Sequence, residues 1–127
     1  MRYEYKNANP KTDKAGDCVI RAISLALNQS WETTYKDLFE IGLKMKRMPN
    51  DRKVWRKYLE SKGWVKCSEP RNWDNTKMTI IRAVDYIKES EIIVNAGNLH
   101  VTYIKDKVLY DTWNCSNKTM HSYWRKK

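Results

Sequence analysis

The order of hydrophobic patterns along this chain of 127 residues limits its fold more than any other feature. Apolar side chains first recur at helical spacing and later alternate as they do in half-buried strands. Helical spacing covers 18–27, 31–48 and 52–61, and strand patterns cover 91–95, 99–104 and 107–113. Because helices come first and closely connected strands last, the sequence predicts an α+β fold. We expect its first helix to pack on a C-terminal antiparallel sheet.

Shorter patterns account for most of the remaining chain. We expect an edge strand over 1–5, an irregular loop over 7–13, a short strand over 64–67, a helix over 78–88 and a fourth strand of the sheet within 119–124. The helix is the least distinct of these, because Thr79-Ile80-Ile81 would also suit a strand. A chain of this length without internal repeats is expected to form a single domain, residues 1–127.

Basic residues outnumber acidic residues by 25 to 15, which gives a formal net charge of +10. Such a charge favours encounters with nucleic acid or with an acidic host protein. The lysines and arginines are dispersed, however, and the densest group, 44–57, has the spacing of a solvated helix face. The chain has no long apolar run and no apolar N-terminal segment. We therefore expect a cytoplasmic protein that does not span a membrane.

Three cysteines, Cys18, Cys67 and Cys115, are too few and too scattered for a disulfide framework or a zinc site. We expect no metal and no cofactor, and a reducing compartment. Cys67 and Cys115 do not begin a helix, and we interpret both as structural or incidental.

Cys18 differs, because it stands between the turn residues Gly16-Asp17 and an apolar run with helical spacing. A cysteine in the first turn of a helix faces unpaired backbone N–H groups and the positive end of the helix dipole. Both favour the nucleophilic thiolate. The alternative is that Cys18 is only a small apolar residue at a helix start.

A nucleophilic cysteine requires a base, and His100 lies within a strand pattern far downstream. A hairpin closed at 105–107 would place Ile104 opposite Val108 and make Asp111 a diagonal neighbour of His100. We therefore expect Cys18 as nucleophile, His100 as base and Asp111 as the residue that orients the imidazole. The other histidine, His121, is interpreted as a surface or edge-strand residue.

Other polar and aromatic residues are candidates for supporting roles. Asn7 or Asn9 could donate to an oxyanion together with the Cys18 N–H, although both could instead serve turns. Asn114 is an alternative to Asp111 as the third member. Asp17 is expected to be the helix N-cap, where its charge would oppose formation of the thiolate. Trp113 could line the cleft beside His100, or it could be a buried core residue.

The chain contains Asn9-Pro10, Gly16-Asp17-Cys18-Val19-Ile20-Arg21-Ala22-Ile23-Ser24, Trp31, Gly63-Trp64, His100-Val101 and Tyr110-Asp111-Thr112-Trp113, and ends near Tyr123-Trp124. This combination resembles small papain-fold cysteine peptidase-like proteins of phages, prophages and Gram-positive bacteria. The segment around Cys18 is also similar to the nucleophile segment of OTU-type deubiquitinases, with the glycine before the acid rather than after it. The resemblance implies a papain-like fold with Cys18, His100 and Asp111 as the triad. It departs at Leu99, where relatives often have glycine.

Two classes of function follow from these features. The first is a papain-like thiol hydrolase that cleaves an amide, peptide or isopeptide bond, or transfers the acyl group to an amine, and whose partner is a peptide or protein. The second is a non-catalytic basic protein on the same scaffold that binds nucleic acid or a host complex.

Overall fold

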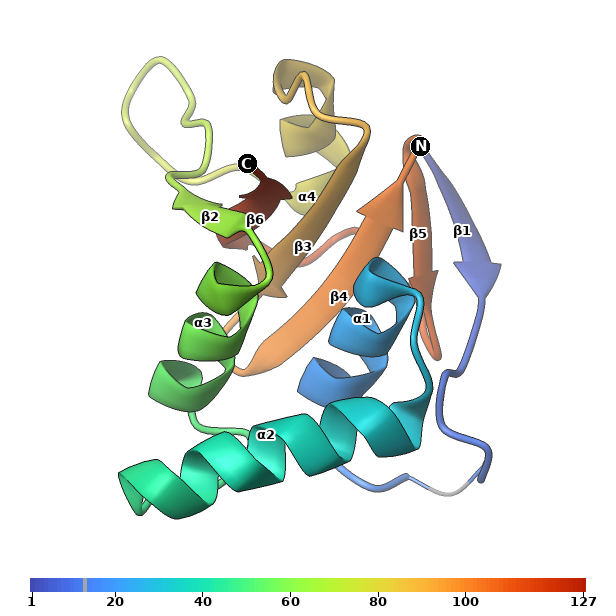
Figure 1. The fold of residues 1–127 in the computed structure, drawn as a ribbon. Coiled ribbons are helices and arrows are strands. Elements are labelled where there is room, and N and C mark those ends of the chain that lie inside the picture. The colour runs from blue at the N-terminus through green and yellow to red at the C-terminus, as the bar shows by residue number, and fades with distance from the viewer. Residues whose placement is uncertain (13) are drawn as a thin grey trace.

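The computed structural model describes residues 1–12 and 14–127; Asp13, the last residue of the first predicted loop, lies outside them. A sheet of six strands separates two groups of helices (Figure 1). The helices are α1 (Cys18–Leu27), α2 (Trp31–Met45), α3 (Arg52–Ser61), α4 (Ile80–Ala83) and the short 3₁₀ helix η1 (Val84–Tyr86). The strands are β1 (Arg2–Tyr5), β2 (Trp64–Cys67), β3 (Glu91–Ala96), β4 (His100–Lys105), β5 (Val108–Asp111) and β6 (Met120–Lys126).

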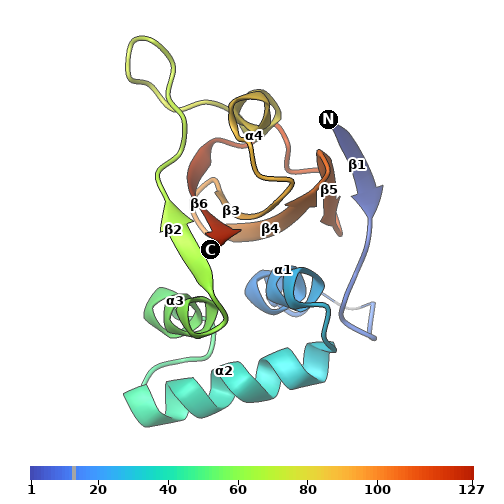
Figure 2. The ribbon, with the colours of Figure 1, turned by 45° about the horizontal axis from the view of Figure 1, so that its top comes forward.

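The three long helices cover one face of the sheet, and α4 covers the other (Figure 2). The core on the first face joins α1 and α3 to the inward side chains of β3, β4 and β6. Within this core the rings of Trp55 and Trp124 meet in an edge-on arrangement, with centroids 6.0 Å apart. The second core is formed by Met78, Ile80 and Ala83 against the opposite face. The predicted α+β class is therefore confirmed.

The sheet is mixed rather than antiparallel. Its strand order is β1-β5-β4-β3-β6-β2, and β1 runs parallel to β5 while every other pair is antiparallel. The predicted edge strand near the N-terminus and the meander of β3, β4 and β5 are both present. The fourth strand, β6, pairs with β3, so it lies on the far side of the meander from β5.

The register of the β4–β5 hairpin differs by one residue from the predicted one. Lys105, not Ile104, lies opposite Val108, because Asp106 and Lys107 alone form the turn. Both turn residues have positive φ (51° and 60°), the conformation of the tight two-residue turn that matches the twist of two strands. A slip of one residue reverses the face of every side chain, and the observed register places His100 and Asp111 on the same face.

The helix boundaries differ from the prediction in two places. α2 ends at Met45 rather than near residue 48, because Lys46 adopts the left-handed conformation that closes a helix (φ 60°). The helix predicted over 78–88 is reduced to α4 and η1. Met78 and Thr79 are extended instead: Met120 N–H donates to the Met78 carbonyl (2.8 Å), and Thr79 bridges to Thr119.

No helix within the described residues is both long enough and apolar enough to cross a membrane.

Candidate active site

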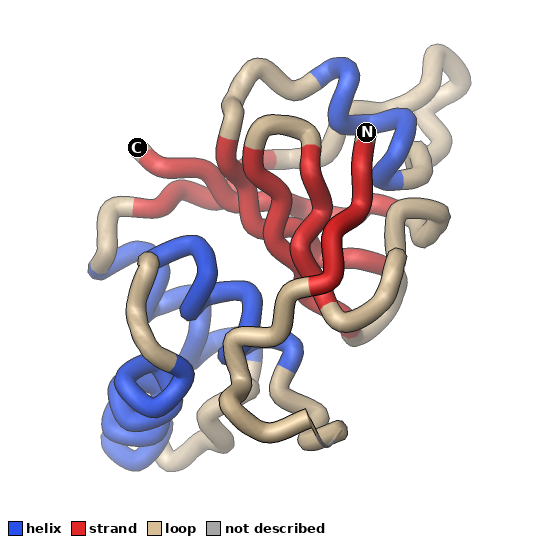
Figure 3. Tube along the Cα trace, turned by 90° about the vertical axis from the view of Figure 1, so that its right-hand side faces the viewer, coloured by secondary structure: helices blue, strands red, loops and turns tan. Residues whose placement is uncertain are grey.

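Cys18 is the first residue of α1, and the backbone before it makes a sharp turn. Gly16 has φ 63°, a conformation that costs other residues about 1–2 kcal/mol. Figure 3 shows the loop after β1 passing the end of the sheet before it enters α1. The half-buried Cys18 thiol donates to the carbonyl oxygen of Leu99, the residue before His100 (Sγ to O, 3.8 Å). The start of α1 and the start of β4 therefore meet.

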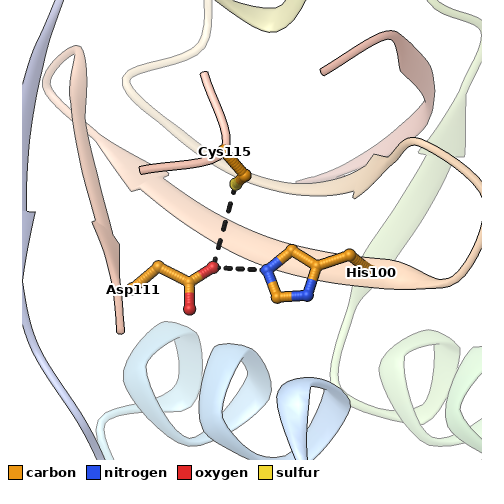
Figure 4. A group of neighbouring side chains, drawn as sticks. All are labelled: His100, Asp111 and Cys115. Atoms are coloured by element: carbon orange, nitrogen blue, oxygen red, sulfur yellow. Dashed lines mark hydrogen bonds and ion pairs between the residues drawn. The ribbon is translucent and has the colours of Figure 1, made fainter. Parts of the chain in front are cut away.

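His100 and Asp111 are in direct contact. His100 Nε2 lies 2.6 Å from Asp111 Oδ2, and the carboxyl group is buried, with 4% of its side chain exposed. Figure 4 shows the second ring nitrogen turned away from Asp111, toward the side on which α1 lies. Asp111 is itself held by the N–H of Thr112, which donates to Oδ1 (2.7 Å). This arrangement fixes the orientation of the imidazole.

Contact between α1 and β4 brings these residues together across a long stretch of chain. The apolar face of α1, which includes Val19, Ile20 and Ile23, packs on the sheet and fixes the position of Cys18. The hairpin register described above brings Asp111 to His100. The position of Cys18 therefore depends on the packing of α1 against the sheet. The contact between His100 and Asp111 depends on the register of the β4–β5 hairpin.

The electrostatic surroundings favour ionisation of this cysteine–histidine pair. Burial opposes the charged thiolate, but hydrogen bonding to His100 and to the backbone at Val101 lowers the pKa of Cys18. Burial also opposes the imidazolium, yet hydrogen bonds with Asp111, Cys115 and Cys18 raise the pKa of His100 to about 11. These opposite shifts favour transfer of the thiol proton to the imidazole, which gives the thiolate beside an imidazolium that is the reactive form of such a pair.

Asp17 occupies the N-cap position of α1, but its side chain makes no capping hydrogen bond. The predicted N-cap position is therefore confirmed, and its backbone carbonyl accepts from Arg21 N–H (2.9 Å), but the side chain does not cap the helix. The buried carboxylate instead accepts hydrogen bonds from Asn9 Nδ2 (2.9 Å) and Trp31 Nε1 (2.8 Å) and pairs with Arg21 one turn along α1. Because Arg21 compensates the charge of Asp17, that charge opposes the Cys18 thiolate less than a free carboxylate would.

Arg21 is a site residue that the sequence did not reveal. Besides its ion pair with Asp17, its Nη2 lies 3.5 Å from Asp111 Oδ1. Only 13% of the Arg21 side chain is exposed. One guanidinium thus connects the start of α1 to the carboxylate that orients His100. An arginine three residues after the nucleophile on the inner side of a helix was the available signal.

Cys115 also lies at the site. It was interpreted as structural, and it is buried (1% exposed), but its thiol donates to the same Asp111 oxygen that binds His100 (3.9 Å; Figure 4). His100, Asp111 and Cys115 each offer a possible metal-ligand atom, all within 4.8 Å of one another. The separation of 2.6 Å between His100 and Asp111 is that of a hydrogen bond, and we interpret the three residues as a hydrogen-bonded group.

An open cleft of about 720 Å³ lies beside Cys18 and His100. Trp113 lines it and is 41% exposed, which excludes the alternative of a buried core residue. Its ring centroid lies 4.8 Å from that of His100, so the indole covers one side of the imidazole. Leu99 is 92% exposed at the rim. The thiol and the imidazole are therefore both next to a space that a substrate could enter.

The three candidate asparagines have different surroundings. Asn7 lines the cleft, and its Nδ2 donates to the Lys11 carbonyl (3.1 Å). Asn9 is not among the described residues that line the cleft, and its Nδ2 donates a hydrogen bond to the Asp17 carboxylate. Asn114 accepts a hydrogen bond from the Ser116 N–H (3.1 Å) in the turn after β5. It is Asp111, and not Asn114, that pairs with His100 Nε2. Asn7 is thus the one of the three amides that lines the cleft.

Comparison with known proteins found no matching family, no similar curated protein and no similar solved structure.

Proposed function

We propose that this protein is a papain-like thiol hydrolase that cleaves an amide, peptide or isopeptide bond. The observation that supports the proposal most is the meeting of Cys18 and His100 at the wall of an open cleft, with Asp111 buried behind the imidazole. A cysteine at a helix start, an imidazole beside it and a carboxylate behind the imidazole are the three parts that nucleophilic acyl transfer requires.

In the proposed reaction, the Cys18 thiolate attacks the substrate carbonyl carbon and forms a tetrahedral intermediate. The unpaired backbone N–H groups at the start of α1 stabilise the developing oxyanion, and Asn7, which lines the cleft, is the candidate amide for a second donor. The His100 imidazolium gives its proton to the leaving amine as the carbon–nitrogen bond breaks. A water molecule then loses a proton to His100 and releases the acyl group from Cys18. An amine in place of this water would give acyl transfer by the same residues.

Labelling and hydrolysis together test this proposal. Limiting iodoacetamide near neutral pH should modify Cys18 ahead of Cys67 and Cys115, as read by peptide mass mapping. Within a fluorogenic peptide and isopeptide library, substrates that the protein hydrolyses should be lost with Cys18→Ala and slowed by about 10²–10⁴-fold with His100→Ala. Cys67→Ser is the matched control and should retain activity.

Preferential labelling of Cys67 or Cys115 would contradict the proposed nucleophile, as would full hydrolysis by Cys18→Ala.

A further inference from the structure

A second concave site lies beside the cleft, at the end of the sheet where β2 and β6 meet the turn after β3. It has a volume of about 430 Å³. The start of α3 and the loop between β2 and α4 complete its wall. Its lining residues are Arg52, Lys66, Ser68, Glu69, Lys77, Asn95, Gly97, Asn98, His121 and Ser122. We call this site the basic pocket.

Positive charge predominates in the basic pocket. Arg52 and Lys66 form no ion pair with any residue of the described chain. The one acidic residue of the lining, Glu69, is already paired with Arg71 (3.1 Å) and lies 3.9 Å from Lys77. The pocket therefore has two cationic side chains left to bind an anion.

Contact between two basic side chains gives a second indication of an anion site. Lys77 Nζ lies 2.6 Å from His121 Nδ1, so the ammonium donates and His121 must be neutral, with its proton on Nε2. The charges of Lys77 and Arg52 help to lower the pKa of His121, after the effect of its burial. A bound anion would offset the effect of these charges on His121 and add a partner for the cations that face the same hollow.

The basic pocket is continuous with the cleft. A hollow of about 570 Å³ shares Gly97, Asn98 and His121 with the pocket, and shares Leu99, His100 and Trp113 with the cleft. An extended chain lying across this surface would therefore pass from the basic pocket, over the turn after β3, to Cys18.

We propose that the basic pocket binds the carboxylate of an aspartate or glutamate side chain in the polypeptide whose amide bond is positioned at Cys18. The inference rests on the proposed function and specifies its substrate as acidic. The pocket already accommodates one carboxylate, that of Glu69, beside Lys77. Ser68, Asn98 and Ser122 supply neutral hydrogen-bond donors, whereas Asn95 Nδ2 already donates to Ser122. Among the described residues that line it, no Trp, Tyr or Phe offers a surface for stacking a nucleobase, which disfavours nucleic acid.

Binding by the inactive Cys18→Ala protein tests the pocket without requiring hydrolysis. The probes are fluorescein-labelled hexaglutamate, hexaglutamine and single-stranded oligothymidylate, followed by fluorescence anisotropy at low and physiological salt. We expect hexaglutamate to bind with an affinity that falls as salt rises. At each salt concentration its affinity should be higher than that of hexaglutamine or oligothymidylate. Arg52→Gln with Lys66→Gln should weaken hexaglutamate binding by about tenfold. Lys53→Gln with Lys57→Gln, which removes the same charge from exposed positions of α3, should change it less than twofold.

Arg52→Lys with Lys66→Arg keeps both charges and should retain binding. Equal binding of hexaglutamine would overturn the proposal, as would equal losses in the two neutralised variants. Oligothymidylate that binds as tightly and depends on Arg52 and Lys66 would instead assign the pocket to nucleic acid. Each of these results is independent of Cys18 chemistry, so it can be separated from a failure of the proposed hydrolase activity.

Discussion

Five ionisable side chains at the candidate site alternate in charge. Asp17 pairs with Arg21, Arg21 approaches Asp111, Asp111 binds His100, and His100 interacts with Cys18. Buried charges are costly unless each has a partner of opposite sign. Arg21, Asp111 and His100 each have a neighbour of opposite charge on two sides, and Asp17 and Cys18 at the two ends each have one such neighbour and a hydrogen bond as well. Arg21 is central to this series, because it neutralises two carboxylates.

Arg21→Met should destabilise the fold by about 3–5 kcal/mol, because it leaves Asp17 and Asp111 buried without their shared cation. Urea unfolding measures the change. Arg21→Lys keeps the charge but lacks the planar guanidinium that can contact two carboxylates. Its free energy of unfolding should therefore lie between those of Arg21→Met and the wild type. Arg82→Met removes an exposed arginine and should stay within about 0.5 kcal/mol. An equally small effect of Arg21→Met would show that the network is not coupled.

The rate of Cys18 alkylation should have an unusual pH dependence. Because the pKa of Cys18 is lowered, the thiolate forms at lower pH than in free cysteine, whose pKa is about 8.5. The iodoacetamide rate should therefore rise and level off below that pH, with N-acetylcysteine as the reference thiol. In His100→Gln, burial of the thiol is no longer offset by the imidazole, so the midpoint should move upward. Identical profiles for both proteins would exclude His100 as the activating group.

The sequence indicated the residue types of the site but not their full surroundings. Cys18, His100 and Asp111 could be selected because the chain has only three cysteines and two histidines, and because Asp111 lies on the strand after His100. The contact of Asp111 with His100 was predicted correctly but from a register that is wrong by one residue: with Ile104 opposite Val108, Asp111 would lie opposite Val101 and face away from His100. Arg21 and Cys115 were missed because their roles depend on contacts between α1 and β5 and between the turn after β5 and the sheet. Local spacing carries no information on such contacts.

At the scale of elements, the end of α2 depends on Gly42. The chain folds back so closely that an added Cβ would lie 2.5 Å from the carbonyl oxygen of Arg47. Arg47 N–H in turn donates to the Gly42 carbonyl (2.9 Å). The left-handed Lys46 makes this close approach possible.

Gly42→Ala should therefore destabilise the protein by about 1–3 kcal/mol, because the clash is with backbone. Helix propensity alone predicts the opposite sign, a gain of about 1 kcal/mol. Thermal or urea unfolding distinguishes the two, with Glu40→Ala at an exposed position of α2 as control. A stabilised Gly42→Ala protein would mean that the chain after α2 moves away easily.

Elements with strong local patterns were predictable, and those set by pairing were not. α1 and α3 have the predicted boundaries because apolar spacing and turn residues agree at both ends. Met78 and Thr79 have helical spacing but are extended in the structure, because their backbone groups pair with residues 119–120. The parallel pairing of β1 with β5 was equally hidden, because a strand pattern does not specify a partner.

At the scale of the molecule, the ion pair between His100 and Asp111 should make stability depend on pH. The lowered pKa of Asp111 means that its contribution is present above about 3.8 and is lost as pH falls through the folded value. The raised pKa of His100 means that its contribution is complete below about 6.5 and declines as pH rises toward about 11. The pair therefore stabilises the fold most between these limits, at about pH 4–6.5.

Unfolding of Cys18→Ala and Cys18→Ala with Asp111→Asn tests this, because removing the thiol leaves the histidine and the carboxylate as the titrating pair. The difference in unfolding free energy between the two proteins should be largest at about pH 4–6.5 and should shrink toward acid and toward alkali. A difference that stays constant from pH 3 to pH 10 would mean that Asp111 contributes by packing alone.

The parallel β1–β5 pair also bears on the order of events during synthesis. Arg2–Tyr5 are synthesised before Cys18, but the strand beside them, which carries Asp111, is synthesised long after it. The hydrogen bond from Tyr3 to the Asp111 carbonyl (3.1 Å) can therefore form only after β5 has been made. Until then, Cys18 in the nascent chain lacks the histidine and the carboxylate that lower its pKa in the folded protein. If Cys18 is the nucleophile that we propose, its activation therefore has to follow the pairing of β1 with β5.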